Sequence, residues 1–216
     1  MQKTIFYVPS SDEKTKLYTQ LCLPDDTAPT AVLQVVHGIT EYSGRYEMLC
    51  RQMTAQGVAV LIHDQIGHGR SAIDEDHRMC IPENGWKYLV EDVRKVRDSV
   101  FTDRKLPTVL LGFSLGSFVV RDYMASRKDA SVQGVILAGT GWQPHIVCSL
   151  MGKLIRSDGR KHGRDAHTAL TQLMMFDNYN KKVNGDGAPM SWLIEQPQEV
   201  KAYLADPLCA DFSSWG

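Results

Sequence analysis

A serine flanked by glycines stands near the middle of the chain, directly after an apolar run. The run Thr108–Leu111 leads into Gly112-Phe113-Ser114-Leu115-Gly116, which matches the strand-to-helix turn called a nucleophile elbow. Such a turn lifts the serine hydroxyl clear of the sheet, so the pattern predicts Ser114 as the nucleophile of an acyl-transfer reaction. A G-x-S-x-G sequence arises by accident in roughly one chain in fifteen of this size. Serine is also a favoured helix N-cap, and a purely structural Ser114 is therefore the alternative.

An acyl-transfer serine needs two backbone N–H donors for the oxyanion that develops during attack. One donor usually follows the nucleophile, and the other comes from a loop after an earlier strand. Leu115 and Ile39 occupy these two places in the sequence. The loops at 37–40 and 64–69 and the turn at Ser114 all follow predicted parallel strands, so they are expected at the edge where α/β sheets bind ligands.

The elements that would position these loops follow an alternating pattern. Short β-branched runs alternate with stretches of helical period, which is typical of an α/β fold with a mostly parallel sheet and flanking helices. The segments 4–8 and 17–23 are predicted to form an initial antiparallel pair. Further strands are predicted at 31–36, 58–62, 108–111 and 132–138, and helices at 46–56, 83–103 and 114–127.

The pattern changes after Gly141, where no further β-branched run appears. Amphipathic helices are predicted at 144–156, 166–179 and 198–205, separated by a solvated basic loop at 158–167. We therefore divide the chain into residues 1–141, the N-terminal part of an α/β core, and residues 142–216, a helical cap or lid.

Composition excludes several classes of function. The 216 residues are 43% hydrophobic with a net charge of −1, so no basic field is available for nucleic acid. No apolar run has the length of a signal peptide or of a membrane span. The five cysteines are scattered without a C-x-x-C pair, which argues against disulfides and zinc and favours the cytoplasm. Neither a G-x-G-x-x-G nor a G-K-[ST] motif supports a nucleotide site.

Three motifs in order carry a family resemblance. They are residues 37–46, His-Gly-Ile-Thr-Glu-Tyr-Ser-Gly-Arg-Tyr, residues 64–71, and the elbow, with a further likeness at 191–193, Val200, Tyr203 and 205–209. This combination resembles the α/β-hydrolase family of monoacylglycerol lipases and lysophospholipases, grouped with the serine aminopeptidase-type hydrolases. Departures are Tyr42 in place of a common histidine, Gln65-Ile66 in place of a His-Arg type pair, and Glu195-Gln196 in place of Arg-Asp.

The resemblance implies a catalytic acid and then a histidine after the lid, and the chain carries no candidate for either there. Asp165 and His167 lie in the basic loop, where rigid positioning is not expected. His63, His68 and His77 precede the serine and are interpreted as structural. The sequence is thus expected to be C-terminally truncated, without the last strands and helices of the fold. Loss of a triad base costs on the order of 10⁶ in turnover, so the chain alone is predicted to be nearly inactive.

The expected substrate is a lipid-like carboxylic ester, with monoacylglycerol or lysophospholipid as model. The resemblance implies no metal and no organic cofactor, and it allows transient contact with lipid aggregates. Apolar lid residues would suit an acyl chain, although helix packing explains them equally well. They are Ile146, Leu150, Leu154, Leu170, Leu173, Met174, Met175 and Phe176. A peptidase or thioesterase of the same fold and a non-catalytic α/β domain are the alternatives. The sequence makes no prediction of oligomeric state.

Overall fold

The computed structural model describes residues 1–75, 77–102, 106–163 and 192–209. The chain forms two compact units, Met1–Gly141 and Trp142–Gly216, and each is described by itself. The helices of the described residues include none that is both long and apolar enough to cross a bilayer.

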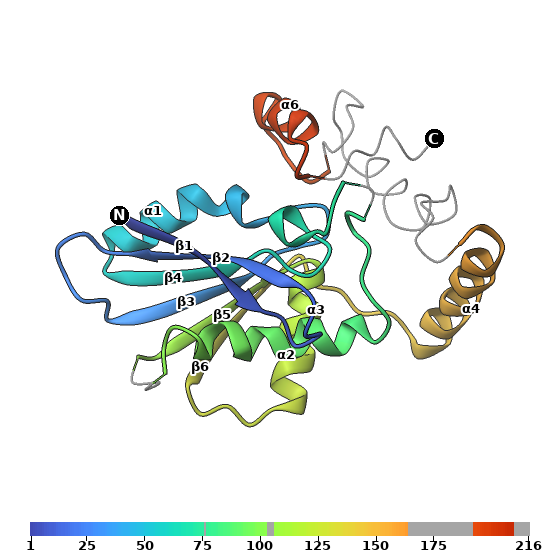
Figure 1. Ribbon diagram of the computed structural model, residues 1–216, viewed down its shortest axis with the longest axis horizontal. Coiled ribbons are helices and arrows are strands. Elements are labelled where there is room, and N and C mark those ends of the chain that lie inside the picture. Colours follow the sequence, from blue (N-terminus) through green and yellow to red (C-terminus); the bar gives the residue numbers. More distant parts are fainter. Residues whose placement is uncertain (76, 103–105, 164–191, 210–216) are drawn as a thin grey trace. The chain divides into compact units, whose positions relative to one another are not determined.

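The first unit is built on a six-stranded sheet with the order β1-β2-β4-β3-β5-β6 (Figure 1). The hairpin strands β1 and β2 are antiparallel, β2 is antiparallel to β4, and the remaining pairs are parallel. The strands are β1 Gln2–Pro9, β2 Lys16–Leu23, β3 Ala31–Val36, β4 Val58–His63, β5 Thr108–Phe113 and β6 Val132–Ala138. The predicted fold class, an α/β-hydrolase fold with a mostly parallel sheet and flanking helices, is confirmed.

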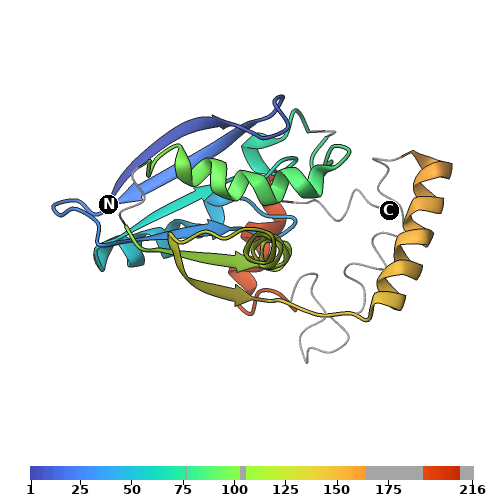
Figure 2. The ribbon, with the colours of Figure 1, turned by 90° about the horizontal axis from the view of Figure 1, so that it is seen from below.

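Helices connect the parallel strands and cover both faces of the sheet. They are α1 Glu47–Ala55, α2 Gly85–Asp98 and α3 Leu115–Ser126, with short 3₁₀ turns η1 Ser43–Tyr46 and η2 Gly69–Ser71. Figures 1 and 2 show α1 and α2 on opposite sides of the sheet. Because successive strand residues point to opposite faces, Val32 and Val36 of β3 pack with α2 and α3, whereas Leu33 and Val35 pack with α1.

The helix that precedes β5 is shorter than its sequence pattern predicts. The periodicity indicated residues 83–103, but α2 spans Gly85–Asp98. Asn84 takes a left-handed conformation with φ 60°, which prevents an earlier start. At the other end the N–H groups of Val100 and Phe101 both bond the carbonyl of Arg97, and this tightened turn closes the helix.

Helices are the elements described in the second unit. They are α4 His145–His162 and α6 Pro197–Ala205. The loop predicted at 158–167 was wrong for residues 158–162, because α4 continues to His162. Its last turn carries Arg160, Lys161 and His162, whose charges suit the carbonyl end of a helix dipole. The helix predicted at 166–179 lies outside the described residues.

Strand β6 forms one edge of the described sheet, with β5 as its neighbour. Val135, Ile136 and Leu137 on this strand are 39–48% exposed. A strand edge of this kind presents unpaired N–H and C=O groups together with apolar side chains.

Two glycines allow α3 to start directly against the sheet. A Cβ on Gly116 would lie 1.9 Å from the carbonyl oxygen of Val36, and a Cβ on Gly112 would lie 2.5 Å from the carbonyl oxygen of Gly116. Both obstacles are backbone atoms, which cannot move aside as a flexible side chain can. The first turn of α3 and the end of β3 therefore approach as closely as backbones without side chains permit.

We expect Gly116→Ala to lower the free energy of unfolding by about 1–3 kcal/mol, because the new methyl group overlaps the β3 backbone. Urea denaturation followed by circular dichroism measures the change. Gly134→Ala on β6 is the matched control, since a Cβ there would lie 3.5 Å from Val109, an ordinary contact, and its effect should stay within about 0.5 kcal/mol. Equal effects of the two substitutions would contradict the close-approach argument.

Candidate active site

Ser114 lies at the junction of β5 and α3 in a strained backbone conformation. Its φ and ψ are 50° and −116°, a region that costs a non-glycine residue about 1–3 kcal/mol. The turn is held by the Ser114 N–H, which donates to the carbonyl of Ala138 at 2.9 Å, and by Ser117, whose N–H and hydroxyl both donate to the Ser114 carbonyl. Surrounding hydrogen bonds thus maintain the strain.

The Ser114 hydroxyl is not used as a helix cap. Ser114 occupies the N-cap position of α3, but its side chain makes no capping hydrogen bond. The residue is partly exposed. Within the described part of the chain, no hydrogen bond joins its Oγ to a histidine or a carboxylate. Among the described residues the Ser114 hydroxyl therefore has no capping partner, and the N-cap alternative has no hydrogen bond to support it.

The N–H groups of Ile39 and Leu115 are free in the described structure. No acceptor among the residues that the structure describes takes either of them. Leu115 is the first residue of α3, whose initial N–H groups point out of the helix. Ile39 follows Gly38, and a Cβ on Gly38 would lie 3.2 Å from the Ser114 Cβ. Both free amides therefore belong to segments that border Ser114.

Glu41 is tied to the same loop, and the sequence analysis gave it no role of its own. Its Oε1 accepts hydrogen bonds from the Gly38 N–H at 2.5 Å and from the Tyr46 hydroxyl at 2.8 Å. Burial raises the pKa of the Glu41 carboxyl, while the two donors and the nearby Arg45 oppose that shift. An acidic residue three positions after Gly38 was the available signal, because a carboxylate at that spacing can reach back to an amide.

His37 fastens the start of the loop as a neutral imidazole. Its Nδ1–H donates to the Gly38 carbonyl at 2.7 Å, and its Nε2 accepts the Gln65 N–H at 3.0 Å. The Gln65 side-chain amide in turn donates to the His37 carbonyl at 2.7 Å. Burial lowers the pKa of His37 well below its usual value. Both ring nitrogens are occupied, so His37 cannot accept a proton from Ser114.

The other histidines considered in the sequence lie in different environments. His63 and His68 are buried, and burial lowers the pKa of each, to about 4 for His63. His77 is exposed and pairs with Asp74. Asp64, in the loop after β4, is buried and accepts the N–H groups of Ser43 and Arg70, so it binds two loops together. Asp165 and His167 lie outside the described residues.

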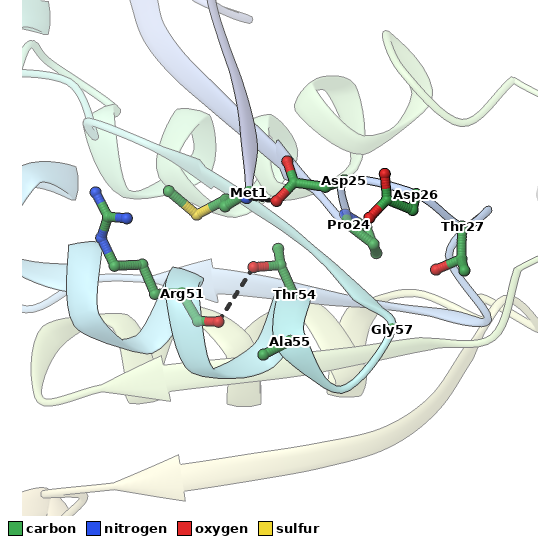
Figure 3. Close-up of a pocket in the computed structure, with 9 residues that line it drawn as sticks. All are labelled: Met1, Pro24, Asp25, Asp26, Thr27, Arg51, Thr54, Ala55 and Gly57. Carbon is green, nitrogen blue, oxygen red and sulfur yellow. Dashed lines mark hydrogen bonds and ion pairs between the residues drawn. The ribbon is translucent and has the colours of Figure 1, made fainter.

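A cavity of about 420 Å³ lies elsewhere in the first unit (Figure 3). Gly57 directly precedes β4, and Pro24–Thr27 precede β3, so the cavity lies at the amino ends of these strands. Ser114 follows the carboxyl end of β5, which runs parallel to β3, so Ser114 lies at the opposite ends of these strands. The cavity is therefore separate from the elbow. It is lined by Met1, Pro24, Asp25, Asp26, Thr27, Arg51, Thr54, Ala55 and Gly57.

The sheet order and the strand–serine–helix junction define an α/β-hydrolase. A family model described as serine aminopeptidase, S33 (Hydrolase_4), matches residues 27–215. The chain belongs to this serine aminopeptidase S33 family. The resemblance predicted from the motifs is thereby confirmed at the level of the family.

Individual relatives include lipases, esterases and a proline iminopeptidase. The human monoglyceride lipase is 36% identical over 110 residues, which is 50% of this chain and 34% of the human protein. Phospholipase YtpA of Bacillus subtilis is 29% identical over 51% of this chain and 40% of its own length. A carboxyl esterase from Bacillus coagulans superimposes with a TM-score of 0.81 and 25% identity, over 97% of this chain and 67% of the esterase. The matched segments thus span about a third to 40% of these two curated relatives.

The buried histidines predict a loss of stability in mild acid. The pKa of His63 is about 4 in the folded protein and 6.5 in the unfolded chain. Between these pH values His63 is therefore protonated in the unfolded chain and neutral in the folded protein. The contribution of neutral His63 to the free energy of unfolding is fully present above pH 6.5. It is lost as the pH is lowered towards 4, by on the order of 3 kcal/mol for this residue. We expect His63→Gln to flatten the decrease in urea midpoint between pH 7 and pH 4.5. The exposed His145→Gln should keep the wild-type slope; identical slopes for all three proteins would refute the assignment.

Proposed function

We propose that this chain carries the nucleophile of a carboxylic ester hydrolase, with monoacylglycerol or lysophospholipid as substrate. The observation that carries the proposal is a strained turn at Ser114, whose hydroxyl makes no capping hydrogen bond and is bordered by two amides without an acceptor among the described residues. Strain of this size persists where a function requires it. Monoglyceride lipase, phospholipase and carboxyl esterase relatives support an ester substrate.

In the proposed reaction Ser114 Oγ attacks the ester carbonyl carbon. The carbonyl oxygen gains the negative charge, and the amides of Ile39 and Leu115 donate hydrogen bonds to it. Collapse of this intermediate breaks the ester C–O bond, and the leaving oxygen takes up the proton lost by Ser114 and departs as the alcohol. Water then hydrolyses the acyl group on Ser114, which releases the carboxylic acid and restores the hydroxyl. The reaction needs no metal or organic cofactor. Scattered free cysteines favour a cytoplasmic site for it.

Removal of the proton from the Ser114 hydroxyl is the step that the chain by itself supports least. An unassisted serine hydroxyl is a poor nucleophile at neutral pH, and Ser114 has no bonded base among the described residues. The remaining acceleration would come from the oxyanion donors and from substrate binding, which give about 10³–10⁴ over water when a triad is removed. We therefore expect slow acylation rather than full turnover.

A peptidase of the same fold is the second candidate. The matching family model is described by an aminopeptidase activity, and fold alone does not determine the acyl group that is cleaved. Rates with p-nitrophenyl esters, acyl thioesters and aminoacyl anilides would separate the candidates. Ester cleavage above the other two supports our proposal, whereas preferential anilide cleavage favours the peptidase.

We expect a fluorophosphonate probe to label the 216-residue chain slowly and at Ser114. Ser114→Ala should abolish the label because the attacking oxygen is lost. Ser126→Ala removes an exposed serine at the end of the same helix and should label like wild type. Mass spectrometry of the labelled peptide makes the measurement, and label on another residue, or none after prolonged exposure, would support the non-catalytic alternative.

A further inference from the structure

The loop after β3 borders Ser114 through Gly38 and has no regular secondary structure of its own. Residues 37–41 follow the end of β3 and precede η1. Thr40 within the loop is buried and has φ 67°, which is unfavourable for a β-branched residue. A loop with such a residue does not hold its shape by backbone preference, so tertiary contacts must fix it.

Two anchors meet this need at opposite ends of the loop. His37 is fastened by Gln65 through two hydrogen bonds, to its ring and to its carbonyl. At the other end Glu41 reaches back to the Gly38 N–H, and the Tyr46 hydroxyl donates to the same carboxylate oxygen. The carboxylate closes the loop into a ring that contains Ile39.

Gly38 lies between the carboxylate and the serine. A Cβ placed on Gly38 would lie 3.0 Å from Glu41 Oε1 and 3.2 Å from the Ser114 Cβ. The peptide that joins Gly38 to Ile39 is planar, so fixing Gly38 limits the directions in which the Ile39 N–H can point. Glu41 thus acts on the amide that borders Ser114, without contact to the reacting atoms.

We propose that Glu41 is a positioning residue that holds the Ile39 N–H in the direction of the oxyanion. This inference rests on the proposed function. Complete loss of one oxyanion donor lowers the rate by about 10²–10³, and loosening the Ile39 N–H lowers it by part of that factor. A merely structural anchor would instead change stability and affect all substrates alike.

The test compares Glu41→Met with Glu41→Gln. Methionine fills a similar volume but accepts no strong hydrogen bond, whereas the glutamine carbonyl oxygen can accept both donors of the native carboxylate. Glu41→Asp, one methylene shorter, replaces Glu41→Met if the latter fails to fold. The first readout is amide hydrogen exchange at Gly38 and Ile39, which reports local opening. We expect exchange about tenfold faster or more in Glu41→Met and close to wild type in Glu41→Gln.

The second readout separates oxyanion stabilisation from general damage. A p-nitrophenyl thionoester places sulfur where the oxyanion forms, and sulfur accepts N–H hydrogen bonds weakly. Wild type should acylate faster with the oxygen ester than with its thiono analogue. Glu41→Met should reduce this rate ratio about tenfold or more, mainly through the oxygen ester and with little change in KM, and Glu41→Gln should restore it.

The outcomes distinguish this inference from the proposed function. If wild type shows no Ser114-dependent acylation, the proposed function fails, and the catalytic purpose of Glu41 fails with it. If wild type reacts but Glu41→Met leaves the rate ratio unchanged, or lowers both substrates equally, Glu41 is only a structural anchor and the inference alone is overturned. Unchanged exchange at Gly38 and Ile39 would overturn it as well.

Discussion

The close backbone approach between the start of α3 and the end of β3 is the constraint on which the remaining site geometry depends. Gly116 faces the carbonyl of Val36 at a separation that leaves no room for a side chain. This contact brings the helix N-terminus to the β3 loop, so the amides of Ile39 and Leu115 border one serine. The strained Ser114 conformation follows from it, because β5 must turn sharply to begin a helix so close to the sheet.

Polar groups beneath the site are used to hold backbone in place. His37 is neutral and hydrogen-bonded at both ring nitrogens. The Asp64 carboxylate accepts hydrogen bonds from two backbone N–H groups, and the Glu41 carboxylate accepts them from one backbone N–H and one tyrosine hydroxyl. Burying such groups is costly unless each is hydrogen-bonded. The loops around Ser114 therefore gain order from side chains that do not themselves react.

Local patterns predicted the elements well, but they missed the ends of two helices and the partners of buried polar side chains. Strands at 31–36 and 132–138 have the predicted bounds because β-branched runs end at clear turn residues. Helix ends were less predictable, since the left-handed Asn84 and the continuation of α4 to His162 depend on local conformations that periodicity does not encode. Motif spacing predicted Ser114 as nucleophile and the Ile39 and Leu115 amides as oxyanion donors, and these roles stay predictions. The roles of Glu41 and Gln65 could not, because their partners are defined by folding rather than by periodicity.

The hydrogen bond from the Ser114 N–H to the Ala138 carbonyl has a consequence for the order of folding. The hairpin β1–β2 needs only its own residues and can form early, whereas each parallel pair must wait for a helix to cross over. The elbow turn has its backbone partner at the end of β6, so its unfavourable dihedral angles lack that support until this strand has joined the sheet. During synthesis the elbow would thus gain its full backbone support only after β6 has been made and has joined the sheet.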